Sequence, residues 1–205
     1  MLDFGVTNLI NSVCWFELTF SIEKLSKTLR AASDEQSANA SVALLLKLDG
    51  ERLHALFVRR VQNSRDPWSG QIALPGGKRE AKDRNLQETV IRETFEETNI
   101  NLLHHCRFLG TMSVFQSKPR PEIKVLPYVV FIEDDPSIRL NKKELEEYFW
   151  ISIEELVRSR TTVKFRFGKF PAFNVGNVII WGLTYRILES LILRLESRAS
   201  FGNDN

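Results

Sequence analysis

The sequence has too few cysteines for a disulfide-stapled or metal-clustered protein. Its 205 residues include two, Cys14 and Cys106, and neither they nor the three histidines show the spacing of a metal site. Two isolated cysteines favour buried thiols in a reducing compartment. No apolar run approaches the ~18 residues that a transmembrane helix requires. The first residues include Asp3 and no basic stretch, unlike a signal peptide. We therefore expect a soluble, cytoplasmic protein with no membrane partner.

The sequence also lacks a large excess of either charge. Its 28 basic and 26 acidic residues give a net charge of +2, which is too small to indicate nucleic acid as a partner. Hydrophobic residues at 43% and charged residues at 26% are typical of a globular chain. No internal repeat is present. The length suits one domain with a substantial core.

Periodicity predicts an order of strands, helix, strands and helix. Strands are expected at 41–48 and 53–61, joined by the turn "DGER", and further strands at 107–115, 123–132 and 147–152. Helices are expected at 20–32, 85–98, 152–159 and 181–195, and residues 163–173 alternate as in a hairpin. Residues 62–83 are rich in Gly, Pro and polar residues and are expected to form a loop. This order predicts an α/β (α+β) fold with a mixed sheet packed between helices.

We divide the chain into an N-terminal helical extension over 1–40, the main domain over 41–197, and a frayed tail over 198–205.

The helix predicted over 85–98 carries an unusual cluster of like charges. Glu93, Glu96 and Glu97 fall within one turn, where they repel each other unless something offsets them. At ~100° per residue, Glu93 and Glu97 lie within about 20° of the apolar stripe that Leu86 and Val90 begin. Glutamates on a merely solvated face should lie opposite that stripe.

Carboxylates at the edge of a core must be neutralised by protons, basic side chains or metal. Arg92 can pair with Glu88 or Glu96, each four residues away. That leaves Glu93 and Glu97 for a hard divalent cation such as Mg²⁺ or Mn²⁺, which prefers oxygen ligands. A solvated acidic face is the alternative at this point.

The preceding segment "LPGGK" points to phosphate chemistry. Gly76 and Gly77 permit a close backbone approach. Cations follow and precede them in sequence, at Lys78, Arg79, Arg59 and Arg60. A diphosphate needs metal across its oxygens and positive charge for the rest. Taken singly, the glycines could form an ordinary turn and the basic residues a solvated strand end.

The stretch "GGKREAKDRNLQETVIRETFEETNI" resembles the Nudix box. The matching residues are Gly77, Arg92, Glu93, Glu96 and Glu97. The resemblance implies an α/β/α sandwich with a mixed sheet. It also implies Mg²⁺- or Mn²⁺-dependent hydrolysis of a nucleoside diphosphate linked to another moiety.

Carried over to this chain, the resemblance implies that Glu93 and Glu97 bind metal, joined by a carbonyl of the glycine loop at Gly76. Glu96 would be a further ligand or would help to activate water, and Arg92 would orient the carboxylates. Gly77, Lys78 and Arg59 would contact substrate.

Three positions depart from the family's pattern. The first acidic position is Asp83, with one extra residue before Arg92, and Thr94 replaces an apolar residue. Asn99 stands where the box has glycine, a mild change because Asn also adopts the left-handed conformation that ends a helix.

The longer spacer and the lead-in "RDPWSGQIALPGG" resemble the coenzyme A pyrophosphatase branch of the family. Arg65, Gly70 and the run "LPGG" match that branch's lead-in, and Arg65 is therefore a candidate substrate contact. The resemblance implies a small-molecule nucleotide diphosphate as substrate, with coenzyme A as the leading candidate. ADP-ribose, dinucleotides and nucleoside triphosphates are alternatives, and a homodimer is possible.

Two further residues are candidates. Glu144 lies where this fold often supplies a catalytic base, and its alternative is a surface carboxylate. Trp68 could stack on a base or could cap the core. A module that only senses a nucleotide is the alternative to an enzyme, and the intact glutamate cluster argues against it.

Overall fold

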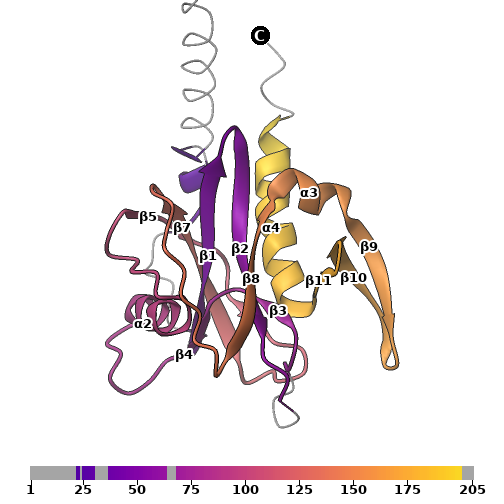
Figure 1. Ribbon diagram of the computed structural model, residues 1–205, viewed down its shortest axis with the longest axis horizontal. Coiled ribbons are helices and arrows are strands. Elements are labelled where there is room, and N and C mark those ends of the chain that lie inside the picture. The colour runs from indigo at the N-terminus through magenta and orange to yellow at the C-terminus, as the bar shows by residue number, and fades with distance from the viewer. Residues whose placement is uncertain (1–21, 24, 31–36, 64–67, 200–205) are drawn as a thin grey trace, which may run out of the picture.

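A computed structural model describes residues 22–23, 25–30, 37–63 and 68–199 (Figure 1). Two long strands, β1 (Ala40–Asp49) and β2 (Arg52–Arg60), are joined by the tight turn predicted from "DGER". β1 pairs antiparallel with β2 and, on its other edge, parallel with β7 (Lys124–Ile132). The sheet is therefore mixed, as the sequence predicts.

Shorter strands complete this sheet. The main path runs β3-β2-β1-β7-β5, while β4, β6 and β8 pair with β1, β7 and β2 respectively. The bounds are β3 (Ile72–Ala73), β4 (Gly76–Lys78), β5 (Cys106–Thr111), β6 (Phe115–Gln116) and β8 (Leu145–Ser152). A second, three-stranded sheet contains β9 (Arg160–Phe165), β10 (Gly168–Val175) and β11 (Val178–Trp181).

Helices cover both faces of the main sheet because its central strands are apolar on both sides. Along β1, Ala43 and Leu45 face the cluster that contains α2 (Leu86–Thr98). The alternate residues Leu44 and Leu46 face the cluster that contains α4 (Gly182–Ala199) and α3 (Ile153–Arg158). Figure 1 shows α2 and α4 on opposite sides of the sheet. This is the predicted α/β/α sandwich.

The structure differs from the expected elements in three places. The strand expected at 107–115 splits into β5 and β6, with residues 112–114 between them, and a bulge within β5 shifts its register against β7 between Phe108 and Gly110. The loop expected at 62–83 contains the short strands β3 and β4. Strand β11 was not predicted, and α4 begins directly after it at Gly182.

The described part of the N-terminal segment packs onto the main domain. Residues 22–23 and 25–26 are helical, and the chain turns at 27–28, well before the predicted end of the helix. Ile22 and Leu25 are buried in the α4-side core. The backbone of Arg30 then pairs with Thr111 at the outer edge of β5. These backbone bonds to β5 explain the early end of the helix.

Several predictions fall on residues outside the described ranges. They concern Cys14, the candidate substrate contact Arg65, the two ends of the N-terminal helix, and most of the tail. The domain bounds 1–40, 41–197 and 198–205 stay predictions.

Among the described residues, no helix is both long enough and apolar enough to cross a membrane.

Candidate active site

Helix α2 is fixed at both ends by asparagine, so the direction of its side chains is well determined. The Asn85 side chain accepts a hydrogen bond from the Glu88 N–H at 2.8 Å and caps the first turn. At the other end Asn99 adopts φ 64°, and its N–H donates to the Phe95 carbonyl. The helix thus ends at the asparagine that replaces the family's glycine.

Glu97 is buried beside the glycine bend, as the helical wheel predicts. It is 4% exposed, and its Oε2 accepts a hydrogen bond from the Gly76 N–H at 2.9 Å. Burial raises the pKa of Glu97 to about 8, against this hydrogen bond, and the charges of Glu93 and Glu144 add to the rise. The structure therefore shows a carboxylate that lacks sufficient positive charge around it.

Glu93 lies one turn earlier, against Gly77. A Cβ atom on Gly77 would stand 2.5 Å from the Glu93 Cδ, so only glycine leaves room for this carboxylate. Burial raises the pKa of Glu93, while Arg92 opposes the rise. The two glycines thus each contact one glutamate of the helix.

Arg92 is the hub of an ion-pair network on the other flank of these glutamates. Its Nε and Nη2 donate to the two carboxylate oxygens of Asp83 at 3.0 and 2.9 Å. Asp83 is 5% exposed and also accepts from the Glu80 N–H and the Thr89 hydroxyl. The Arg92 hydrogen bonds hold the pKa of Asp83 well below its usual range. Asp83 therefore anchors Arg92, although one residue more separates it from Arg92 than in the family's pattern.

Of the two expected partners of Arg92, Glu96 is confirmed and Glu88 is not. Glu88 pairs with Arg84 instead. Arg92 Nη1 contacts both Glu93 Oε1 and Glu96 Oε2 at 2.9 Å. Glu93 is therefore not left free of Arg92, and Glu96 lies partly exposed beside the arginine.

Glu144 lies near enough to Glu93 and Glu97 for its charge to act on both. The Asn141 amide donates to Glu144 Oε1 at 2.8 Å, and the Asn141 N–H donates to the Glu97 carbonyl. The charge of Glu144 raises the pKa of both Glu93 and Glu97. The turn that precedes β8 thus holds a third carboxylate, that of Glu144, near those of Glu93 and Glu97.

The structure selects Arg60 rather than Arg59 as the cation at this site. Arg59 pairs with Glu147 at 3.1 Å and lies over the Phe149 ring, on the α4 side of the sheet. The register against β8 shifts between Arg59 and Arg60, so strand alternation does not place Arg60. Its positive charge lowers the pKa of Glu97, and Arg60 therefore lies on the side of the glutamates.

The other predicted substrate contacts lie at the border of the site. Trp68 packs with a small cluster that contains Ala40 and Val125, and Arg120 lies over its ring at 5.5 Å. The Lys78 carbonyl accepts from Arg92 Nη2, and the Lys78 side chain is exposed. Trp68 thus contacts part of the core, and its role as a substrate contact stays a prediction.

Thr94 is the one box residue whose chemistry does not suit its position. It is fully buried in α2, and its hydroxyl has no hydrogen-bond partner in the described part of the chain. Burial of an unpaired hydroxyl lowers stability.

The donor set suits a hard divalent ion. Glu93 and Glu97 offer only oxygen ligands, and both have pKa values raised by burial, so a cation would supply the missing positive charge. In the ranges that the structure describes, no three acidic, histidine or cysteine side chains form a ready-made ligand group.

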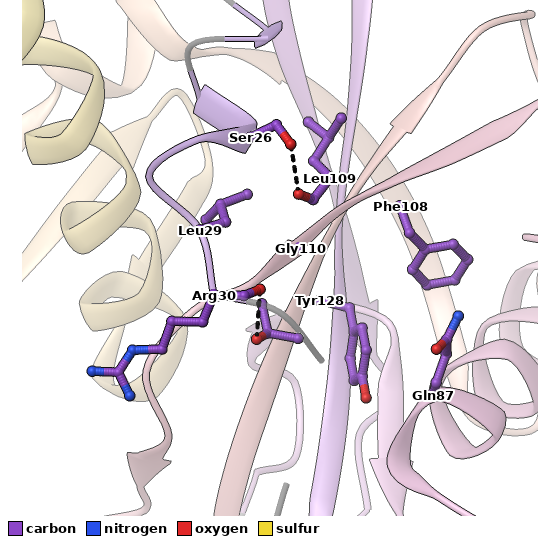
Figure 2. A pocket seen from close by; sticks show the side chains of 9 residues that line it. Ser26, Leu29, Arg30, Gln87, Phe108, Leu109, Gly110 and Tyr128 are labelled. Carbon is purple, nitrogen blue, oxygen red and sulfur yellow. Dashed lines mark hydrogen bonds between the residues drawn. The ribbon is translucent and has the colours of Figure 1, made fainter. Parts of the chain in front are cut away.

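A pocket of about 350 Å³ lies on another flank of α2 (Figure 2). Gln87, Phe108 and Tyr128 line one side, and Leu29 and Arg30 of the N-terminal segment line the other. Its strands, β5 and β7, lie away from β4, which contacts Glu93 and Glu97. None of the predicted site residues lines this pocket.

Comparison with known proteins agrees with this geometry. The family model described as the NUDIX domain matches residues 37–172. The chain is 30% identical over 152 residues to the peroxisomal coenzyme A diphosphatase ndx-8 of Caenorhabditis elegans, which covers 73% of the chain and 63% of the relative. It is also 30% identical over 175 residues to the mouse mitochondrial coenzyme A diphosphatase NUDT8, covering 81% of the chain and 82% of the relative.

The chain spans 63% of the length of ndx-8. It spans 33% of the length of another curated relative, an uncharacterized protein of Schizosaccharomyces pombe. Among solved structures, the Mycobacterium smegmatis Nudix hydrolase RenU matches with a TM-score of 0.54 and 14% identity, over 82% of this chain and 90% of that one. The NUDIX domain of Shewanella oneidensis NrtR matches with a TM-score of 0.51 and 15% identity, over 80% and 88%. These likenesses show the fold.

Proposed function

The chain belongs to the Nudix hydrolase family, and from that premise we propose that it hydrolyses the diphosphate bond of a nucleoside diphosphate derivative, with coenzyme A as the leading substrate. The observation that carries the proposal is the pair Glu93 and Glu97, held against Gly77 and Gly76 with pKa values that burial raises. The two relatives named as coenzyme A diphosphatases, each at 30% identity, support the choice of substrate.

In this proposal Glu93 and Glu97 hold Mg²⁺ or Mn²⁺, with Glu96 as a further candidate ligand. The bound ion would neutralise negative charge on the diphosphate and increase the acidity of a water molecule. Arg92, itself held by Asp83, keeps the Glu93 carboxylate turned toward the glycine bend. The chain thus supplies a fixed set of oxygen ligands beside a backbone that a phosphate can approach.

The reaction adds water across one phosphorus–oxygen bond of the diphosphate bridge. The water oxygen bonds to one phosphorus, the bridging oxygen leaves with the other phosphate, and a carboxylate takes up the proton that water loses. Glu144 is our candidate for that base because it lies beside Glu93 and Glu97 and is held by Asn141. Glu96 is the alternative. With coenzyme A the products would be phosphopantetheine and an adenosine bisphosphate.

A substrate panel tests this proposal. The purified chain is incubated with coenzyme A, ADP-ribose, a dinucleotide or a nucleoside triphosphate, each with Mg²⁺ or Mn²⁺, and the products are resolved by mass. We expect coenzyme A to be split with the highest kcat/KM. Faster cleavage of another compound would move the assignment to that substrate. Tight nucleotide binding without any turnover would instead support a nucleotide-sensing module.

A matched pair of variants tests the site. Glu97→Gln should lower kcat about a hundredfold or more, because it removes a metal ligand. Glu88→Gln removes a carboxylate of the same helix that pairs only with Arg84, and it should leave kcat unchanged. Equal effects of the two variants would contradict the assignment of Glu97.

A further inference from the structure

The β9–β10 hairpin carries an aromatic cluster that the proposed hydrolysis does not use. The Phe165 and Phe167 rings stack with centroids 5.4 Å apart and 4° between their planes. Trp181 packs 4.5 Å from Phe165, and Phe170 closes the group. Phe167 is 67% exposed. Figure 1 shows the hairpin extending away from the main sheet, on the opposite side from α2.

The residues at the tip are not ones that a tight turn needs. Phe165 pairs with Gly168, so Arg166 and Phe167 form a two-residue connection. Such connections favour small residues such as asparagine and glycine. Neither Arg166 nor Phe167 adopts a positive φ, because Gly168 takes that conformation at φ 143°, so the turn itself neither forbids nor selects an arginine and a phenylalanine at its tip.

The same hairpin concentrates positive charge. Lys164 lies directly across from Lys169 in the strand register, an arrangement that like charges disfavour. Neither lysine nor Arg166 forms an ion pair with any residue in the described ranges. Residues 156–188 contain no acidic residue and six basic ones: Arg158, Arg160, Lys164, Arg166, Lys169 and Arg186. An anionic partner would relieve this repulsion.

We propose that the tip of this hairpin docks on an anionic phospholipid surface. Phe167 enters the interfacial layer, while Lys164, Arg166 and Lys169 contact the lipid headgroups. Peripheral membrane binding combines the burial of apolar surface with the attraction between basic residues and anionic headgroups, and the tip of this hairpin offers both. The absence of a membrane partner was expected from the composition of the whole chain, and the proposal replaces that expectation for this one surface.

The geometry favours lipid over single-stranded nucleic acid. Nucleic-acid sites stack bases on open aromatic faces along a basic groove. Here Phe165 and Phe167 stack on each other, and Trp181 packs against both. The group lies on a projecting hairpin whose exposed edge suits insertion more than base stacking.

Vesicle flotation with the full chain tests the proposal, using phosphatidylcholine vesicles and vesicles of equal parts phosphatidylcholine and phosphatidylserine. We expect binding only to the second kind, with a loss of binding in high salt. The double variant Lys164→Gln/Lys169→Gln should lower the partition coefficient about 25-fold, at about fivefold per lysine. Phe167→Ser should lower it about tenfold or more.

Matched controls separate the hairpin from general charge and hydrophobicity. Lys27→Gln/Arg52→Gln removes the same charge from exposed positions elsewhere. Leu103→Ser removes an apolar side chain that is 68% exposed. Both controls should bind vesicles as the wild type does, and the hairpin variants should keep the melting temperature and any hydrolase activity.

Absence of binding to anionic vesicles, or equal loss in the hairpin and control variants, would overturn the proposal. A single-stranded oligonucleotide that binds more tightly than the vesicles, and loses affinity in the same hairpin variants, would assign the surface to nucleic acid instead.

Discussion

Replacing Glu97 by glutamine should make the metal-free protein more stable at alkaline pH while it lowers activity. The Glu97 carboxyl is 4% exposed and lies near the charges of Glu93 and Glu144, so its ionised form is unfavourable without a cation. Glutamine keeps an oxygen that can accept from the Gly76 N–H and carries no charge. The substitution therefore removes the unfavourable charge and keeps the hydrogen bond.

The sign and size of the effect follow from the pKa of Glu97, which burial raises from 4.5 to about 8. Between these values the unfolded chain ionises while the folded chain keeps its proton, so the free energy of unfolding falls as pH rises. At ~1.4 kcal/mol per unit, the loss is on the order of 5 kcal/mol above pH 8. For a chain of this size that corresponds to about 10 to 20 °C in melting temperature.

Thermal unfolding with a chelator, followed across this pH range, measures the effect. The wild type should lose melting temperature between about pH 5 and pH 8, and Glu97→Gln should show a flatter profile. Added Mg²⁺ or Mn²⁺ should restore the alkaline stability of the wild type but not of the variant. Parallel pH profiles for the two proteins would refute the claim that Glu97 is buried without sufficient positive charge.

Three further substitutions have definite expected outcomes. Gly77→Ala should displace the Glu93 carboxylate and lower kcat, which steady-state kinetics would show. Thr94→Val should raise the free energy of unfolding by about 1 kcal/mol in urea titration, since it removes a buried unpaired hydroxyl; a loss would mean that the hydroxyl has a partner. Asp83→Asn should cost about 3 kcal/mol, because it leaves Arg92 without its buried charged partner. The low pKa of Asp83 also implies that this contribution persists at pH 5, and a variant as stable as the wild type there would contradict it.

The sequence predicted the elements that carry their own local signals. The "DGER" turn fixed β1 and β2, and Asn85 and Asn99 fixed the ends of α2. Strands β3 and β4 carry no such signal, because two or three residues show no period and form only by pairing with β2 and β1. The bulge in β5 likewise has no local sequence signal. Its Gly110 lies where a Cβ atom would press on Leu29 of the N-terminal segment, a long-range contact.

The choice between Arg59 and Arg60 shows a limit of strand periodicity. Their strand is apolar on both faces, since Leu56 packs on the α2 side and Phe57 on the α4 side. Alternation alone therefore does not tell which arginine faces α2, and the register shift against β8 between Arg59 and Arg60 interrupts the alternation itself. The effect of the Arg60 charge on Glu97 shows that Arg60 lies near α2.

The crowding of acidic residues on α2 is explained by an asymmetry across the helix. On one flank Arg92, anchored by Asp83, pairs with Glu93 and Glu96 and offsets their repulsion. On the other flank Glu97 accepts one hydrogen bond from the described residues, that of the Gly76 N–H, and lies between the positive charge of Arg60 and the negative charge of Glu144. If the stability of the helix were the only requirement, its acidic side chains would be neutralised on both flanks. The unequal arrangement locates the side on which a cation and a diphosphate would complete the site.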